Sequence, residues 1–347
     1  MWTFRPAARA WRGAGAAAPV AFHSALPGYT PTRLVELPAL AGELGVGRVL
    51  VKDESARLGL PAFKILGASW AVRRLLETST PGALVAASDG NHGRALARVA
   101  AWHGLPARIY LPSGVHPAAH AAIEAEDATV IDVPGSYDTA VAAAAADAET
   151  SDGALVQDTA WAGYEKIAGW IVEGYLTLFA ELDDQLPAAP GLVIVPAGVG
   201  SLAQAAVTHY RRAGLGAAPA LLAVEPDTAA CVLASLAHGE LRTVATTATI
   251  MAGLNCGTVS CSAWPLLRAG LDAACSISDH AAAVAAADLA RLGVPAGPCG
   301  AAPLAAAREV LTDPDRARQL GVTRHSVVVL LCTEGQAANP VLRGERS

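Results

Sequence analysis

Short apolar runs alternate with stretches of helical spacing along most of this 347-residue chain. No other feature limits the fold as strongly, because parallel strands need a crossover, usually a helix, between them. The pattern predicts an α/β fold with mainly parallel sheets flanked by helices. We expect strands at 48–55, 83–88, 107–112, 128–134, 191–197, 220–226 and 326–335, and helices at 63–78, 94–104, 164–183 and 202–213.

Charge and hydropathy exclude several classes of protein. The net charge of −6 gives no basic surface for nucleic acid, and no run of about 18 strongly apolar residues predicts a membrane helix. Residues 1–29 are rich in Arg and Ala and lack acidic residues, somewhat like a transit peptide, but they have no apolar segment of a secretory signal. We expect them to form an extension that packs on the body of the protein.

The six cysteines all lie in the second half of the chain. None belongs to a C-x-x-C pair, and Cys256 and Cys261 have no histidine at ligand spacing. We expect buried free thiols in a reducing cytoplasm, rather than disulfides or a zinc site. The cysteines are Cys231, Cys256, Cys261, Cys275, Cys299 and Cys332.

A glycine loop, PAGVGSLAQAA, follows the expected strand 191–197 and precedes a helix. Glycine allows the close approach that lets the backbone amides of residues 198–201 converge on a phosphate at a helix N-terminus. These residues are Gly198, Val199, Gly200 and Ser201. The spacing also satisfies G-x-G-x-x-A, and Glu225 ends the next strand, where NAD enzymes place a ribose-binding acid. The loop indicates a phosphate-sized anion, with an ordinary tight turn as the alternative.

A second glycine turn, SDGNHG, follows the expected strand 83–88. Its glycines and Asn91 present donors that suit a substrate carboxylate. His92 taken alone is more often a structural residue than a catalytic one, and Asp89 stands where aspartate commonly caps a helix. The turn is a candidate substrate site formed by Ser88, Asp89, Asn91 and His92.

Lys64 is one of only three lysines, since 22 of the 25 Lys and Arg residues are arginine. It lies beside Phe63 in the apolar segment GLPAFKILGAS. An amine in apolar surroundings is less easily charged and can form a Schiff base, which arginine does not do. Lys64 is therefore a candidate nucleophile, with a helix-surface lysine as the alternative. We expect Lys52, by contrast, to form a structural ion pair with its neighbours Asp53 and Glu54.

The segment VQDTAWAGYEKIAGW, residues 156–170, combines an aspartate with three aromatic residues. Trp161, Tyr164 and Trp170 lie near helical spacing, which predicts core packing. Asp158 precedes the next expected helix, so it either caps that helix or moves protons at the mouth of a cleft. The sequence leaves both roles open.

Together, these four segments match the needs of one cofactor, pyridoxal 5′-phosphate. This cofactor requires a lysine for its aldehyde, a cradle for its phosphate, a hydrogen bond to its ring hydroxyl and a group at its pyridine nitrogen. Lys64 meets the first need and residues 198–201 the second. An NAD-dependent oxidoreductase would use the glycine loop but leave Lys64 and the turn at 88–92 without a role.

The chain also resembles a known family, the diaminopropionate ammonia-lyases, which are fold-type II pyridoxal phosphate enzymes. The resemblance lies in VKDES, AFK-LG, DGNHGRA, VQDTAW-GY, AGVGS, TIMAGL-CG and TEG, and it extends from LPGYTPTRL to CTEG. Threonine dehydratases and cysteine synthases share AFK-LG and DGNHG in looser form. QDTAW-GY and IMAGL-CG are specific to the ammonia-lyases.

The resemblance implies how the cofactor is held. Lys64 would bind it covalently, beside Phe63, and Asn91 would contact its ring hydroxyl. The loop 198–201 would bind its phosphate. Thr333 matches the small hydroxyl residue expected near the pyridine nitrogen.

The resemblance also implies catalytic residues and a reaction. Asp89 and Asp158 match two aspartates near the substrate Cα, with Asp89 the proton acceptor for the D-isomer and Lys64 that for the L-isomer. The reaction would be α,β-elimination on 2,3-diaminopropionate or a related β-substituted amino acid, giving a 2-keto acid and ammonia. A hydroxy-amino-acid dehydratase and a β-replacement synthase are alternatives with the same cofactor, and a catalytically inactive ligand-binding homologue is a further one.

Two lobes follow from the same resemblance. Residues 1–69 and 159–347 would form a large cofactor-binding domain, and residues 70–158 a smaller inserted one. We expect a cytoplasmic homodimer that acts on a small amino acid, with no metal, nucleic acid or membrane as a partner.

The chain departs from the family at several places. At 297–301 it has GPCGA where the family usually has a Ser-Gly-Glu-Ser-Gly type segment. Cys332 replaces a serine, and Asn255 lies in GLNCG. The loss of a glutamate and of serine bears on the substrate and its leaving group, but not on the cofactor.

Overall fold

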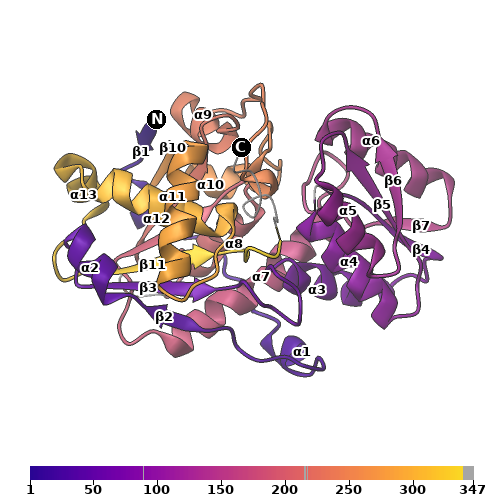
Figure 1. The fold of residues 1–347 in the computed structure, drawn as a ribbon, viewed down its shortest axis with the longest axis horizontal. Helices are drawn as coiled ribbons and strands as arrows, with labels where there is room; N and C mark the ends of the chain where they lie inside the picture. Colours follow the sequence, from indigo (N-terminus) through magenta and orange to yellow (C-terminus); the bar gives the residue numbers. More distant parts are fainter. Residues whose placement is uncertain (89, 215, 217, 339–347) are drawn as a thin grey trace.

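The computed structural model describes residues 1–88, 90–214, 216 and 218–338. Two separate sheets divide this part of the chain into a large and a small lobe (Figure 1). The strands and helices expected from the apolar alternation are present close to their expected bounds. The prediction of an α/β fold with mainly parallel sheets is therefore confirmed.

The sheet of the large lobe has seven strands. Their order is β1 (Trp2–Phe4), β10 (Ala273–Ile277), β9 (Ala220–Pro226), β8 (Leu192–Pro196), β11 (Val327–Cys332), β3 (Arg48–Asp53) and β2 (Leu34–Glu36). The outer strands β1 and β2 pair antiparallel with their neighbours, and all other pairs are parallel. Strands β8, β9 and β11 are buried along their whole length, which explains their continuous apolar sequences.

Helices pack on both faces of this sheet. On β8, Val193 and Val195 belong to one apolar core, whereas Leu192 and Ile194 belong to the other, because alternate side chains of a strand point to opposite faces. The first core includes α3 (Ile65–Leu76), α7 (Lys166–Gln185), α8 (Ser201–Tyr210), α9 (Cys231–His238) and α10 (Trp264–Gly270). The second includes α2 (Pro38–Leu44), α11 (Asp279–Arg291), α12 (Pro298–Leu311) and α13 (Pro314–Leu320).

The sheet of the small lobe has four parallel strands. Their order is β6 (Thr129–Val133), β5 (Ala107–Pro112), β4 (Ala83–Ala87) and β7 (Gly153–Leu155). In Figure 1 this sheet lies at the right with α4 (Asn91–Trp102), α5 (Pro117–Glu124) and α6 (Tyr137–Thr150). The shorter elements of the fold are α1 (Val20–Ser24), η1 (Ala8–Ala10) and η2 (Ala252–Leu254).

Two glycines let α3 and α7 cross closely below the space between the lobes (Figure 1). A Cβ atom added at Gly67 of α3 would lie 2.5 Å from Cε1 of Tyr175, and one at Gly174 of α7 would overlap the backbone of Leu66. Larger side chains at either position would force the helices apart. This crossing matters for function because Lys64 directly precedes α3.

The N-terminal segment packs on the body, as we expected, although its manner of packing was not foreseen. Strand β1 pairs with β10, and neither strand was predicted from the sequence. Arg9 reaches Asp272, which precedes β10, with its Nε atom 3.1 Å from Oδ1. Since the two segments are about 270 positions apart, only the folded chain shows that they are neighbours.

Lys52 does not pair with the residues beside it in sequence, so that prediction was wrong. Its Nζ atom lies 2.6 Å from Oε2 of Glu181 on α7. Asp53 pairs with Arg33, and Glu54 is part of a different ion pair. Consecutive side chains of a strand point to opposite faces, which explains why Lys52 and Asp53 have different partners.

The cysteines are less uniformly buried than we expected. Cys256 and Cys261 are half-buried, and the other four are buried. Within the described ranges, no group of histidine, cysteine and acidic side chains has the composition of a metal site. No helix among the described residues is both long and apolar enough to cross a membrane.

Candidate active site

A cavity lies between the lobes, at the carboxyl ends of β8 and β11 and at the start of α3, α4 and α8. Parallel α/β sheets commonly bind ligands at this edge. The sequence-predicted residues that line it are Phe63, Lys64, Ser88, Asn91, His92, Asp158, Gly198, Val199, Gly200, Ser201 and Thr333. Asp89 lies outside the described residues. Segments spread over 270 positions of the chain therefore meet in one place.

Lys64 occupies the N-cap position of α3. The preceding segment is held against the end of β11, because the amide of Phe63 donates to the carbonyl of Thr333 at 3.3 Å. The Nζ atom lies 5.5 Å from the centre of the Phe63 ring and 6.0 Å from that of Tyr175. The side chain is 19% exposed, so the amine is largely enclosed by aromatic surface yet reaches the cavity.

The carboxylate of Asp158 lies directly beside this amine, with Oδ2 2.5 Å from Nζ of Lys64. Burial alone would raise the pKa of Asp158, but the ammonium of Lys64 outweighs it and lowers the pKa to about 2. Asp158 is therefore ionised at neutral pH. It does not cap the next helix, since α7 begins at Lys166.

The neighbours of Asp158 hold it in place. The hydroxyl of Ser201 donates to the Asp158 carbonyl at 2.6 Å, which joins this segment to the glycine loop. The hydroxyl of Tyr164 donates to the carbonyl of Leu155 at 2.9 Å. Tyr164 and Trp161 stack on each other, whereas Trp170 is buried in the core, so only Trp170 fully meets the expectation of core packing.

The glycine loop 198–201 turns directly into α8. A Cβ atom at Gly198 would lie 3.0 Å from Sγ of Cys256, and Gly200 has a φ of +92°, which side chains disfavour. No backbone hydrogen bond within the described part of the chain uses the amides of residues 198–201 as donors. These amides and the positive end of the helix form a cradle for an anion.

In the turn at 88–92, most polar groups have structural partners. The Ser88 hydroxyl accepts hydrogen bonds from the amides of Gly90 at 3.0 Å and Gly93 at 2.8 Å. Nε2 of His92 donates to the carbonyl of Val156 at 2.7 Å, and burial lowers the pKa of His92, which favours the neutral ring. The Nδ1 atom of His92 is buried with no hydrogen-bond partner among the described residues.

Glu334 lines the same cavity but was not singled out from the sequence. Its carboxylate accepts hydrogen bonds from Nδ2 of Asn91 at 2.6 Å and from the amide of Cys299 at 3.2 Å. The signal was present, since the motif TEG places Glu334 directly after Thr333. Tyr137, Cys256 and Cys299 are further lining residues that were not selected from the sequence. Cys256 lies in the motif TIMAGL-CG and Cys299 in GPCGA, whereas nothing in its sequence context marked Tyr137.

Glu225, the candidate ribose-binding acid, is used elsewhere. Its two carboxylate oxygens accept the amides of Val232 and Leu233, both at 2.8 Å, in the first turn of α9. Glu225 is fully buried. A carboxylate engaged in this way does not present itself to a ribose, so the geometry argues against an NAD site.

Comparison with known proteins identifies the family. A family model described as pyridoxal-phosphate dependent enzyme matches residues 25–334. The diaminopropionate ammonia-lyase of Salmonella typhimurium is 34% identical over 92% of this chain and 88% of that protein, and the Escherichia coli K12 enzyme is 35% identical over 90% and 86%. This chain belongs to the diaminopropionate ammonia-lyase family. The resemblance inferred from its motifs is thereby confirmed.

Solved structures of fold-type II enzymes are similar to this ammonia-lyase family member over nearly its whole length. The E. coli diaminopropionate ammonia-lyase in complex with an aminoacrylate-PLP azomethine intermediate aligns with a TM-score of 0.87 at 32% identity, covering 99% of this chain and 96% of that one. A threonine deaminase from T.th. aligns with a TM-score of 0.76 at 27% identity, covering 91% and 96%. The fold-type II prediction is confirmed.

The residues of this ammonia-lyase family member fit pyridoxal 5′-phosphate, the cofactor of its family. The cradle at 198–201 leaves little room for a side chain at Gly198. Lys64 presents an amine to the cavity, and Asn91 and Thr333 add polar groups on its wall. These residues therefore offer one group each for the aldehyde, the phosphate, the ring hydroxyl and the pyridine nitrogen of the cofactor.

Proposed function

We propose that this enzyme catalyses α,β-elimination of 2,3-diaminopropionate, or of a closely related β-substituted amino acid, to a 2-keto acid and ammonia. The observation that carries the proposal is the Lys64–Asp158 pair beside an anion cradle in the same cavity. Bound pyridoxal phosphate withdraws the electron pair left when the Cα proton is removed. Relatives named diaminopropionate ammonia-lyase support the choice of substrate.

Lys64 and Asp158 would divide the proton transfer between them. The amine of Lys64 would accept the Cα proton of an L-substrate, and the ionised carboxylate 2.5 Å away would stabilise the resulting ammonium. Asp89 is our candidate acceptor for a D-substrate. Proton transfer by a positioned group typically contributes about 10²–10⁴-fold to the rate.

Other lining residues would hold the cofactor and the substrate. The amides of residues 198–201 would bind the cofactor phosphate at the start of α8, and Thr333 would contact the pyridine nitrogen. Asn91 would donate to the ring hydroxyl, and Phe63 would border the ring. We propose that the turn containing Ser88 and His92 binds the substrate carboxylate through its backbone at the start of α4. The Ser88 hydroxyl already serves the turn itself.

An adjoining cleft of about 720 Å³ would give the substrate access. It lies between the lobes, shares Asn91, Tyr137 and Glu334 with the cavity, and includes His116 and Thr249. Its size is within the range of small-molecule sites. A small amino acid would therefore enter between the two lobes.

The function is tested with the purified holoenzyme and a panel of D- and L-β-substituted amino acids. We expect pyruvate and ammonia from diaminopropionate without an added nucleophile, since a β-replacement synthase would need one. If diaminopropionate is inert and a β-hydroxy amino acid reacts, the enzyme is a dehydratase, like the threonine deaminases of the same fold. Bound cofactor without Cα–H exchange for any amino acid would instead indicate an inactive ligand-binding homologue.

A second experiment tests the cofactor attachment. Borohydride should bleach the bound cofactor and label Lys64, which peptide mass spectrometry would locate. The expected label on Lys64 would also exclude an NAD-dependent oxidoreductase as the function of the glycine loop. A label on Lys52 or Lys166 would overturn the assignment of Lys64.

We also propose a homodimer in the cytoplasm and a small domain at residues 70–158, inserted between 1–69 and 159–347. The strands β4 to β7 all lie within that range, which supports a separate small domain, although its first boundary falls inside α3. Light scattering of the holoenzyme would give twice the chain mass. Limited proteolysis would cut first in the exposed turns nearest these boundaries, at 77–80 and 151–152. A monomer, or cleavage elsewhere first, would contradict these proposals.

A further inference from the structure

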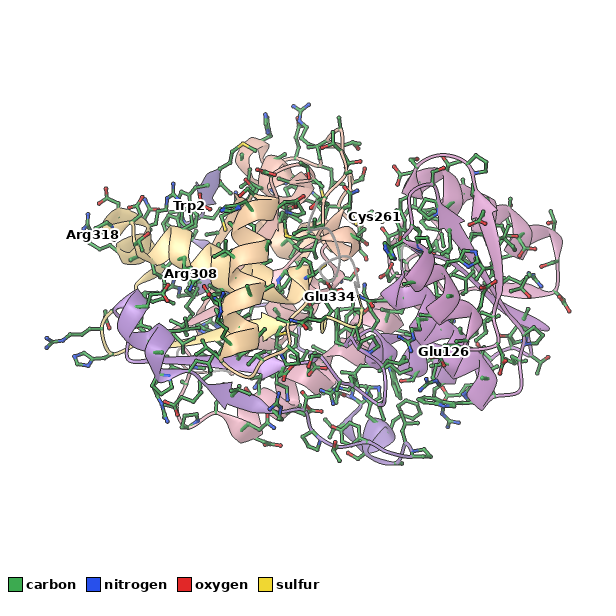
Figure 2. The ribbon with its side chains drawn as sticks, viewed as in Figure 1. Trp2, Glu126, Cys261, Arg308, Arg318 and Glu334 are labelled. Atoms are coloured by element: carbon green, nitrogen blue, oxygen red, sulfur yellow. The ribbon has the colours of Figure 1, made fainter. Side chains whose placement is uncertain are left out.

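Glu334 is a buried acid at the boundary of the active-site cavity, and only 3% of its surface is exposed. It follows β11, on the side of the large lobe that faces the small lobe (Figure 2). Its two oxygens accept hydrogen bonds from uncharged groups, the side chain of Asn91 and the backbone of Cys299. A buried carboxylate is costly unless such bonds offset its desolvation, so its presence at this place requires a reason.

The segment GPCGA, where this chain departs from its family, packs against Glu334 and donates hydrogen bonds to it. The carboxylate meets the amide of Cys299 in the first turn of α12, where the helix dipole favours negative charge. The amide of Gly297 also donates to the Glu334 carbonyl at 3.0 Å. A Cβ atom at Gly300 would overlap that carbonyl, so the glycines allow α12 to approach this closely.

The second oxygen of Glu334 determines how the Asn91 amide is oriented. An ionised carboxylate only accepts hydrogen bonds, so the nitrogen and not the oxygen of the Asn91 amide must face it. The separation of 2.6 Å between Nδ2 and Oε2 fits that orientation. Because the amide nitrogen carries two hydrogens, one remains to donate into the cavity that Asn91 lines.

Burial raises the pKa of Glu334 above its ordinary value, and the bonds from Cys299 and Asn91 and the charge of Lys64 offset this only in part. The ionised form therefore depends on these neighbours. Loss of Asn91 or of the helix approach would favour the protonated acid, which no longer constrains the amide in the same way.

We propose that Glu334 is a positioning residue that fixes the Asn91 amide so that it donates to the ring hydroxyl oxygen of pyridoxal phosphate. The inference rests on the cofactor-binding role proposed above for Asn91. Glu334 acts through Asn91 and does not itself touch the reacting atoms. The segment GPCGA is then the structure that brings this acid to the cofactor in this chain.

The test compares Glu334→Gln with the wild-type enzyme by absorbance. Glutamine can turn either its oxygen or its nitrogen toward Asn91, so the amide of Asn91 is no longer fixed. We expect the cofactor to bind about tenfold more weakly, and the pH midpoint of its absorbance change to shift by about one unit. Glu334→Asp keeps the charge but is one methylene shorter, so we expect a shift in the same direction.

A double-mutant cycle separates positioning from a general structural role. In an Asn91→Ala background, Glu334→Gln should cause no further shift of the absorbance midpoint, because the residue through which Glu334 acts is gone. Additive shifts would overturn the proposal. An unchanged spectrum in both Glu334 variants would overturn it as well.

Glu126 offers a matched control in the small lobe, well away from Glu334 (Figure 2). It is also a buried carboxylate with two partners, Arg94 and Arg98. Glu126→Gln should leave cofactor affinity and absorbance at wild-type values. An equal loss of affinity in both variants would reduce the Glu334 effect to general destabilisation and overturn the inference. Turnover of diaminopropionate by the wild type is measured separately. Failure of the proposed function is thereby distinguished from failure of the positioning role of Glu334.

Discussion

The Nζ atom of Lys64 lies 2.5 Å from Oδ2 of Asp158, although 94 positions separate the two residues. Lys64 precedes α3 and Asp158 lies eight residues before α7, and these two helices cross closely at Gly67 and Gly174. The crossing places an amine and an ionised carboxylate together at the cavity. This pair is the most direct point at which to test the proposed chemistry.

Asp158→Asn should lower turnover by about 10²–10⁴-fold and leave the bound cofactor largely in place. The amide keeps the shape of the side chain but cannot stabilise the ammonium of Lys64. Steady-state kinetics and the absorbance of the bound cofactor measure the two effects. Asp132→Asn is a suitable control, because that side chain is 78% exposed on β6 of the small lobe. Near-normal turnover in Asp158→Asn would remove Asp158 from the proton transfer.

The same pair should make the stability of the cofactor-free protein depend on pH. Folding lowers the pKa of Asp158 from 3.8 to about 2, so the unfolded state binds more protons between these values. The stabilisation is complete above the unfolded pKa and is lost as the pH falls toward 2. We expect the difference in unfolding free energy between the wild type and Asp158→Asn to shrink by about 2 kcal/mol between pH 5 and pH 2. Urea titrations over this range measure it, and a constant difference would contradict the prediction.

Gly200→Ala should weaken cofactor binding. An alanine at a φ of +92° is strained by about 1–2 kcal/mol, and its Cβ would lie 2.8 Å from Cδ1 of Leu267, so the loop would have to move. We expect the dissociation constant for the cofactor to rise about tenfold or more, as measured by absorbance titration. Gly169→Ala on α7 is the control, since a Cβ there meets nothing within 4 Å and alanine favours a helix. Similar affinity in both variants would argue against the loop as the phosphate site.

Glu181→Gln should destabilise the fold without changing the cavity. Glu181 pairs with Lys52 and Arg57, with separations of 2.6 Å, and both cationic side chains are fully buried. Removing the charge leaves the buried ammonium of Lys52 without the carboxylate it pairs with, whereas Arg57 keeps its pair with Glu54. Such an uncompensated buried charge typically costs about 3–5 kcal/mol. Chemical denaturation measures the loss, and Glu43→Gln, at a half-exposed pair with Arg308, should have little effect. Equal losses of unfolding free energy in the two variants would contradict the expectation that a buried ion pair matters more to stability than an exposed one.

Much of the fold could be predicted from the sequence because the signals were local. Strands such as β8 and β9 are uninterrupted apolar runs, and the helices between them have their own spacing. The short strands β1 and β7 lack such a signal, since three residues show no periodicity. These segments are strands because they pair with strands that are distant in sequence.

Candidate site residues could also be predicted from the sequence, because their chemistry follows from the residue type. A rare lysine in an apolar segment, two glycine turns and the family motifs were sufficient to select Lys64, Asn91 and the loop 198–201. These choices rested on what an amine, an amide and a glycine can do, and on neighbours that are adjacent in sequence. The sequence by itself therefore determined the fold class, the family and the set of candidate side chains.

The tertiary structure alone decided which polar groups meet. It assigned Lys52 to Glu181 instead of its neighbours, engaged Glu225 at the start of α9, and brought Glu334 to Asn91 across 243 positions. Such pairs depend on how helices and strands pack, and packing joins residues whose separation in sequence carries no information about their distance. For that reason, the residues of the site could be predicted from the sequence, whereas the hydrogen-bond and ion-pair partners of its acidic residues could not.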